Sequence, residues 1–196
     1  SITDAKSARL ALKLAVKEMN RRYDVHQEHA VRDVASYHKN ILWPYQEKAQ
    51  DGDDAGDAPE RMPYIVIIID ELADIMQAYP RELEAGIVQL AQMSRAVGIH
   101  LILSTQRPSV NVITGLIKAN VPTRLALQVA SSVDSRTILD AGGAEQLLGK
   151  GDMLYMTGEM SKPVRVQSPN ITEEEVKKVV DWLKKYYRGD VPDEID

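Results

Sequence analysis

The 196-residue sequence contains no cysteine and no phenylalanine. The absence of cysteine excludes disulfides, thiolate metal sites and a thiol nucleophile. No apolar run approaches the roughly 20 residues that span a bilayer, and the amino terminus lacks the charged and then apolar pattern of a signal peptide. Because 44% of the residues are apolar, the chain can fill the core of one domain. These features predict a soluble, cytoplasmic, globular protein without a membrane segment.

Two further absences concern ligands. The formal net charge is −5, so the chain lacks the basic excess with which many proteins hold nucleic acid, although local contacts remain open. The sequence also lacks the phosphate-binding motif G-x-x-x-x-G-K-[ST]. The nearest match, which begins at Gly143, has five residues between its glycines instead of four, and Gly151 stands where serine or threonine is required. We therefore reject it as a phosphate loop.

Residue periodicity predicts an α/β fold whose alternating strands and helices are typical of a parallel sheet with crossover helices. The predicted strands span residues 64–69, 99–105 and 123–129, followed by a hairpin of 152–157 and 163–168. The predicted helices span residues 4–23, 31–48 with Pro44 as a candidate break, 82–97, part of 108–120, 132–139 and 172–189. The last helix is expected to bury Val176, Val179, Val180, Leu183 and Tyr187.

This pattern predicts one domain with a small C-terminal appendage. Residues 1–168 are predicted to form the main domain, with a mobile acidic loop at residues 51–60. Residues 169–196 are predicted to form a C-terminal helix and tail.

The strand at residues 64–69 ends in two adjacent carboxylates, Asp70 and Glu71. Its apolar residues predict burial on both faces, and the carboxyl edge of such a sheet is where open α/β folds bind ligands. Asp70 can hold the hydration shell of Mg²⁺, and Glu71 can polarise a water molecule that attacks the γ-phosphate of a nucleotide. The simpler interpretation is that both acids begin a helix, because acids favour the first turn.

The strand at residues 99–105 also ends in polar residues, Thr105 and Gln106. Because parallel strands present their carboxyl ends at one edge of a sheet, we expect these residues to lie beside Asp70 and Glu71. Thr105 or Gln106 can then sense the γ-phosphate and relay its presence to the loop that follows. The simpler interpretation is a strand that enters a turn at Arg107.

Five segments together resemble the motor domain of the FtsK/SpoIIIE family of DNA translocases. They are Tyr64–Asp74, Ala91–His100, Ser104–Arg124, Asp134–Asp140 and Gly149–Leu154, of which Ser104–Arg124 is especially specific. The similarity covers most of residues 1–168. It implies a mostly parallel, RecA-like P-loop NTPase sheet flanked by helices, in a homo-hexameric ring that pumps double-stranded DNA with ATP and Mg²⁺ during chromosome segregation and cell division.

The resemblance also implies roles for single residues. Asp70 and Glu71 would be the Walker B acids, with Asp70 contacting Mg²⁺ through water, and Thr105 and Gln106 would be the sensor. Asp70, Glu71 and Gln106 would therefore face the nucleotide.

Three basic residues receive roles from the same resemblance. Arg136 resembles an arginine that reaches the phosphates of the neighbouring subunit. Arg107 and Lys118 resemble residues of the loop that faces the DNA channel, where they would contact phosphates.

The chain departs from the family pattern at the phosphate loop. Family members carry this Walker A segment ahead of the Asp-Glu strand, so we interpret the chain as a fragment that binds and hydrolyses no ATP alone. The strand before that loop normally lies between the sensor strand and the next one. We therefore expect either direct pairing of residues 99–105 with 123–129, or association with another chain through exposed sheet edges.

Other interpretations remain open. The chain could be a non-catalytic or engineered α/β assembly module derived from such a motor, with idle motifs. His26, His29 and His38 fit no tight metal-ligand spacing, so a metal site there is disfavoured. His100 is expected to be a hydrogen-bonded core residue or a residue that supports the site from behind, and not a catalyst. Trp182, Tyr186 and Tyr187 are expected to be packing anchors.

Overall fold

The computed structural model describes residues 3–50 and 56–187, which form an α/β fold. The strands are β1 (Ile65–Ile69), β2 (Ile99–Leu103), β3 (Arg124–Leu127), β4 (Asp152–Met156) and β5 (Val164–Gln167). The α-helices are α1 (Ala5–Glu28), α2 (Val34–Tyr37), α3 (Trp43–Gln50), α4 (Leu72–Ala78), α5 (Pro80–Met93), α6 (Gly115–Asn120), α7 (Ser132–Leu139) and α8 (Glu173–Tyr186). Part of the predicted acidic loop, residues 51–55, lies outside the described residues, and residues 56–60 form neither helix nor strand.

The strands form two sheets. β1 and β2 pair in parallel, in register from Ile65 opposite Ile99 to Ile69 opposite Leu103. β3, β4 and β5 form an antiparallel sheet, which contains the predicted hairpin as β4 and β5. The predicted direct pairing of residues 99–105 with 123–129 is wrong, because β3 takes β4 as its partner. Among the described residues, no strand pairs with the outer edge of β1 or of β2.

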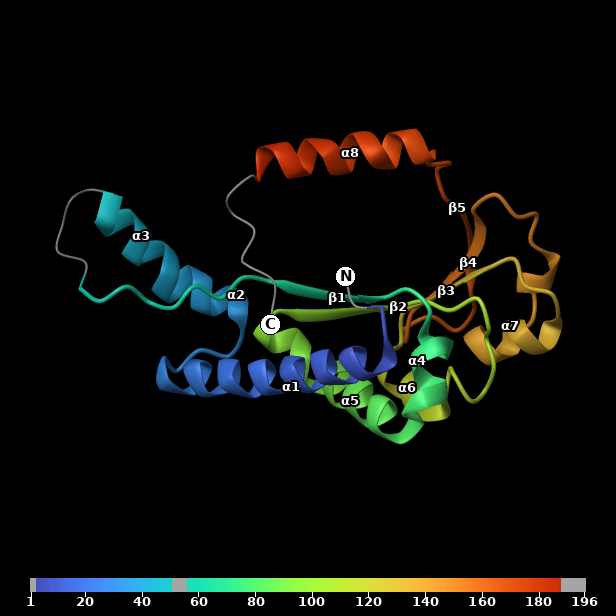
Figure 1. Ribbon diagram of the computed structural model, residues 1–196, viewed down its shortest axis with the longest axis horizontal. Helices are drawn as coiled ribbons and strands as arrows, with labels where there is room; N and C mark the ends of the chain where they lie inside the picture. Colours follow the sequence, from blue (N-terminus) through green and yellow to red (C-terminus); the bar gives the residue numbers. More distant parts are fainter. Residues whose placement is uncertain (1–2, 51–55, 188–196) are drawn as a thin grey trace.

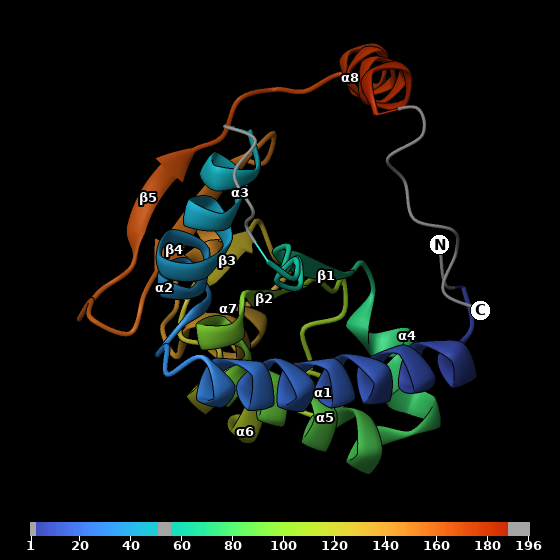
Figure 2. The same ribbon diagram turned by 90° about the vertical axis from the view of Figure 1, so that its left-hand side faces the viewer.

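One face of the β1–β2 sheet is covered by helices, and α1, α4 and α5 lie on that side (Figures 1 and 2). The core cluster on this side includes Leu12, Met19, Leu83, Ile87, Leu90 and Ile99. On the opposite face Tyr64, Val66, Ile68 and Ile102 are each more than half exposed. The prediction that the first strand is buried on both faces is therefore wrong, since alternate residues of β1 meet no covering element in the described chain.

His100 lies on this bare face as well, so its predicted burial in the core is wrong. Its ring lies 5.9 Å from that of Tyr64, centroid to centroid. Because side chains alternate along a strand, the position of His100 in β2 places it beside the exposed residues.

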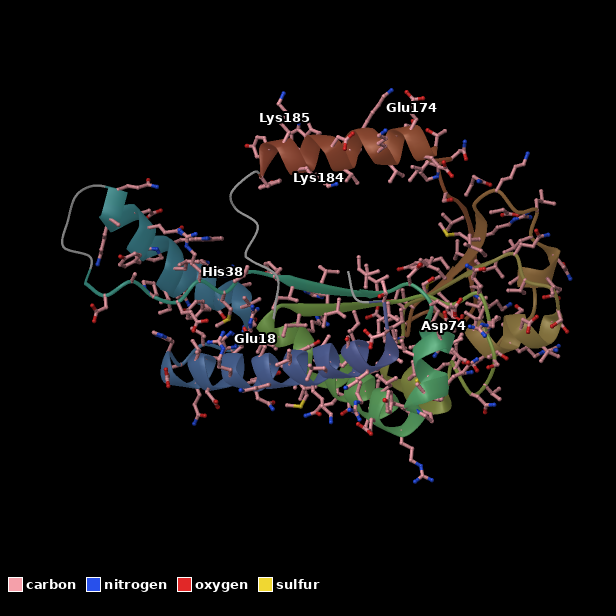
Figure 3. All side chains as sticks on the ribbon, viewed as in Figure 1. Glu18, His38, Asp74, Glu174, Lys184 and Lys185 are labelled. Carbon is pink, nitrogen blue, oxygen red and sulfur yellow. The ribbon has the colours of Figure 1, made fainter. Side chains whose placement is uncertain are left out.

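α8 forms where it was predicted, with Thr172 as its N-cap in a capping box with Glu175. Its expected burial is wrong, because every side chain from Glu173 to Tyr187 is exposed. Trp182 and Tyr186 do not anchor the helix to the core and instead stack on each other at 5.0 Å between ring centroids. α8 lies on the bare side of the β1–β2 sheet, and Glu174 and Lys185 point away from that sheet (Figures 1 and 3).

The remaining helices follow their sequence signals with shifted boundaries. α1 begins after Asp4, whose carboxylate accepts a hydrogen bond from Ser7 N at 2.8 Å, and it extends beyond the predicted end at residue 23. Pro44 does not end the second helical region, because α2 continues through a π-helix, residues His38–Leu42, into α3. The third predicted helix appears as α5 followed by a 3₁₀ turn, Ser94–Val97, and α4 precedes it. No helix among the described residues combines the length and apolarity that a bilayer crossing requires.

Candidate functional site

The ends of β1 and β2 are joined by backbone hydrogen bonds that continue past the strands. Ser104 N donates to Ile69 O at 2.8 Å, and Leu72 N donates to Ser104 O at 2.8 Å. α4 therefore starts at the carboxyl edge of the sheet, directly beside the segment that follows β2. This arrangement brings Glu71 and Thr105 together.

Glu71 is the centre of this site because both of its carboxylate oxygens accept hydrogen bonds. Thr105 Oγ1 donates to Oε1, and Gln106 N donates to Oε2 at 2.9 Å. Ala73 N also donates to Oε1 at 3.2 Å, so Glu71 is the N-cap of α4. The predicted proximity of the two strand ends is thus present, and the simpler interpretation, an acid that begins a helix, describes the same residue.

These contacts favour the ionised form of Glu71. The hydrogen bond from Thr105 lowers the pKa of Glu71 most, and partial burial opposes it. The backbone N–H groups of Gln106 and Ala73 and the positive charge of Arg107 lower the pKa further. A carboxylate held in this way is a weaker base than a free one.

Asp70 and the side chain of Gln106 are exposed beside Glu71. Gln106 uses only its backbone N–H to bind the carboxylate, so its amide group is available to a ligand. Asp70 supplies exposed carboxylate oxygens, the ligand type that Mg²⁺ and its water shell prefer. The donor set therefore fits a hydrated Mg²⁺ ion.

Arg107 joins the site through a residue that the sequence did not single out. Its Nη2 atom contacts the carboxylate of Asp74, which lies in the first turn of α4. Its backbone N donates to Thr105 Oγ1 at 3.0 Å. The sequence offered no separate signal for Asp74, because an acid in the first turn of a helix is common for electrostatic reasons alone.

Lys118 and Arg136 lie elsewhere. Lys118 Nζ donates to Asp140 Oδ1 at 2.6 Å, and Arg124 Nη1 donates to Asp140 Oδ2 at 2.6 Å. Lys118 first and Arg124 second lower the pKa of Asp140. Arg136, on α7, is exposed and donates to Ser132 Oγ at 3.3 Å. Among the described residues, neither cation has a hydrogen bond or ion pair with Glu71.

The histidines of the amino-terminal region form no metal site in the described part of the chain. His26 is buried against Tyr37, with ring centroids 6.2 Å apart. His38 Nε2 is hydrogen-bonded to Met62 O at 2.7 Å, so one of its ring nitrogens is already engaged. These rings pack with aromatic neighbours instead of converging on one point.

Two parallel strands that deliver Asp70, Glu71, Thr105 and Gln106 to one sheet edge define an α/β domain with a candidate ligand site at the carboxyl ends of its parallel strands. The profile of the FtsK/SpoIIIE family matches residues 1–110. The chain belongs to the FtsK/SpoIIIE family.

Curated relatives support this assignment. The DNA translocase FtsK of Clostridium tetani is 50% identical over 190 residues, which cover 97% of this chain and 24% of the relative. The DNA translocase SpoIIIE of Bacillus subtilis is 50% identical over 182 residues, covering 93% of this chain and 22% of the relative. The chain thus spans about a quarter of the length of these relatives.

Solved structures show the same fold. The pCW3 conjugation coupling protein TcpA, in its monomer form with ATPγS, superimposes with a TM-score of 0.74 at 27% identity, covering 92% of this chain and 50% of TcpA. The cytoplasmic domain of the Thermomonospora curvata Type VII secretion ATPase EccC gives a TM-score of 0.62 at 22% identity, covering 86% of this chain and 18% of EccC. The EccC match supports the fold alone.

Proposed function

We propose that this chain is the acid and sensor part of an ATP-driven motor that moves double-stranded DNA in chromosome segregation and cell division. The observation that carries the proposal is the contact of Thr105 and Gln106 with both oxygens of Glu71. In a family of DNA translocases, this pairing suits a residue that activates water next to a residue that reports the γ-phosphate. The proposal places the chain in the cytoplasm, where ATP and chromosomal DNA meet.

Each residue of the edge has a distinct part in this proposal. Asp70 holds the hydration water of Mg²⁺, and Glu71 orients and polarises the attacking water. Thr105 and Gln106 hold Glu71 and respond to the γ-phosphate. ATP with Mg²⁺ supplies the phosphoryl group to be transferred and the charge that neutralises its oxygens. Because the sequence contains no G-x-x-x-x-G-K-[ST] motif, the phosphate cradle has to come from residues outside these 196.

The basic residues extend the proposal to DNA and to a homo-hexameric ring. Arg107 is the better placed DNA contact, because its side chain is 53% exposed, whereas that of Lys118 is 20% exposed and bound to Asp140. Arg136 is exposed on α7 and can reach a neighbouring subunit. Mixing Arg136→Ala subunits with unaltered subunits tests this role, since unchanged ATPase activity of the mixed ring contradicts it.

The central experiment compares this chain with a version joined to the preceding phosphate-loop segment of a family relative. Calorimetry with ATP and Mg²⁺ is expected to detect no binding to the chain alone. The joined protein is expected to hydrolyse ATP faster when duplex DNA is present. Glu71→Gln in the joined protein lowers kcat by about 10²–10⁴-fold, the usual contribution of a general base.

The matched control is Glu84→Gln, which makes the same change on α5, where Glu84 lines a shallow groove next to α4. Its kcat is expected to stay within about twofold of the unaltered value. Equal loss in both variants, or a joined protein that binds ATP without hydrolysing it, contradicts the role of Glu71. The second outcome favours the non-catalytic assembly module.

Self-association through sheet edges is also part of the proposal, because the outer edges of β1 and β2 lack strand partners among the described residues. Ile102→Lys places a charge on β2 at a residue that is 53% exposed. Sedimentation is expected to show weaker association for Ile102→Lys than for Val133→Lys, whose position on α7 is 67% exposed and outside both sheets. Equal association of the two variants contradicts edge pairing.

A further inference from the structure

The carboxylate of Asp74 holds the segment that binds Glu71, whereas its backbone N donates to Glu71 O at 3.3 Å within the first turn of α4. Its carboxylate pairs with Arg107 Nη2. Asp74 belongs to the first turn of α4, and Glu71 is the N-cap of the same helix. The ion pair therefore ties residue 107 to the helix that Glu71 begins.

Arg107 continues this connection through its backbone. Arg107 N donates to Thr105 Oγ1 at 3.0 Å, and the same hydroxyl donates to Glu71 Oε1. Because a hydroxyl has one proton to donate, the hydrogen bond from Arg107 leaves that proton directed at Glu71. Gln106, which lies between Thr105 and Arg107 in the sequence, donates a hydrogen bond from its backbone N to Glu71 Oε2 at 2.9 Å. Residues 105–107 thus bind the start of α4 at two carboxylates, those of Glu71 and Asp74.

We propose that Asp74 is a positioning residue that, through Arg107, keeps Thr105 and Gln106 on Glu71, and that a DNA phosphate releases Glu71 by taking Arg107 from Asp74. The DNA part rests on the proposed function. Release removes the hydrogen bonds of Thr105 and Gln106 from Glu71, so that its carboxylate can accept a hydrogen bond from the attacking water when DNA is bound.

The exposure of the ion pair makes this exchange feasible. The side chains of Arg107 and Asp74 are 53% and 65% exposed, and exposed ion pairs contribute little to stability. A phosphate accepts strong, often bidentate hydrogen bonds from arginine and can replace the carboxylate. Lys118 offers no equivalent exchange, because Asp140 binds both it and Arg124.

The Gln106 amide resonance in NMR spectra of this chain reports the contact with Glu71 directly. Asp74→Asn is expected to accelerate hydrogen exchange of the Gln106 amide by about two- to fivefold, which corresponds to the loss of one exposed ion pair. Arg107→Gln is expected to do the same, although it leaves the charge at the first turn of α4 intact. The amide of Ala73, which binds Glu71 Oε1 from α4 itself, is expected to stay unchanged in both variants.

Glu84→Gln is the matched control, since it removes one negative charge from α5 next to α4 and leaves residues 105–107 untouched. An unchanged Gln106 amide in Asp74→Asn overturns the positioning role. Equal acceleration of the Gln106 and Ala73 amides also overturns it, because that result means that α4 has lost its first turn.

The DNA part is tested by adding a duplex of about 20 base pairs at low salt, where phosphate contacts are strongest. The Gln106 amide of the unaltered chain is expected to move towards its position in Asp74→Asn, while Arg107→Gln shows no further movement. Duplex that binds without moving this amide overturns the release step alone. If the duplex does not bind, both the release of Glu71 by DNA and the DNA contact of Arg107 in the proposed function are overturned. The effect of Asp74→Asn on the Gln106 amide still decides the positioning role.

Discussion

Arg22 Nη1 donates a hydrogen bond to the carbonyl oxygen of Val97 at 2.9 Å, inside the core. The same atom donates to Pro63 O at 2.8 Å, and Nε donates to Glu18 Oε1 at 2.7 Å. Arg22 is only 2% exposed. One guanidinium therefore links α1 to the chain just before β1 and just before β2, and fixes where both strands of the site begin.

Arg22→Met is expected to lower the free energy of unfolding by about 2–4 kcal/mol, because it leaves buried carbonyl groups without donors. Urea denaturation measures the change. The neighbouring Arg21 shares Glu18 but is 45% exposed, so Arg21→Met is expected to cost less than about 1 kcal/mol. Equal losses in the two variants would show that the buried carbonyl contacts contribute nothing.

Asp152 gives the second sheet a pH-dependent contribution to stability. Its buried side chain accepts two hydrogen bonds from Arg165, which lower the pKa of Asp152 to about 2, and Leu148 N adds a third. Because the folded pKa lies below the ordinary 3.8, this stabilisation is present above pH 4 and is lost as the pH falls towards 2. Urea midpoints of Asp152→Asn are expected to fall less over this interval than those of the unaltered chain. Parallel pH profiles of the two proteins would contradict this assignment.

His26 also makes stability depend on pH, but here burial disfavours the charged form of the side chain. It is 2% exposed, and both ring nitrogens lack hydrogen-bond partners among the described residues. Burial lowers the pKa of His26 most and Arg22 lowers it further, whereas Asp33 raises it. The unfolded chain therefore takes up a proton more readily, and stability is lost as the pH falls below the ordinary 6.5.

His26→Leu is expected to raise the free energy of unfolding by about 1 kcal/mol at pH 7 and to reduce its fall between pH 7 and pH 5. The control is His29→Gln, at an exposed position that ends the same helix. Urea denaturation at several pH values measures both variants. A His26→Leu profile as steep as the unaltered one would assign the pH dependence to other groups.

The exposed apolar side chains of α8 predict that their truncation has little effect on stability. Leu183 is 42% exposed, and Leu183→Ala is expected to change the free energy of unfolding by less than about 1 kcal/mol. Leu90 on α5 is fully buried, and Leu90→Ala is expected to cost about 2–5 kcal/mol. A comparable loss in Leu183→Ala, measured by urea denaturation, would mean that α8 packs against the domain in solution.

Much of the site follows from local sequence. The apolar runs before Asp70 and Thr105 predicted two strands, and the shared direction of parallel strands predicted that Glu71 and Thr105 meet. The capping box at Thr172 likewise predicted the start of α8. These features depend on residues close together in the chain, which is why their pattern is visible in the sequence.

The predictions that were wrong concern contacts between segments that are distant in the sequence. Val66 and Val179 have the side chains of buried residues, yet both are more than half exposed. Apolar periodicity says which face of an element can be covered, but the covering element is chosen by packing elsewhere. Likewise, nothing local distinguishes Asp74 as the partner of Arg107, because the pair is set by how α4 begins beside the end of β2.

The sequence by itself determined the family, the α/β class and the identity of the acids and polar residues at the ends of β1 and β2. Only the tertiary structure decided that Thr105 and Gln106 occupy both oxygens of Glu71, that Arg107 pairs with Asp74, and that β3 joins β4 and not β2. The reason is physical. Residue type fixes what a side chain can bind, whereas the choice among competing partners depends on distances that exist only after the strands have paired and the helices have packed.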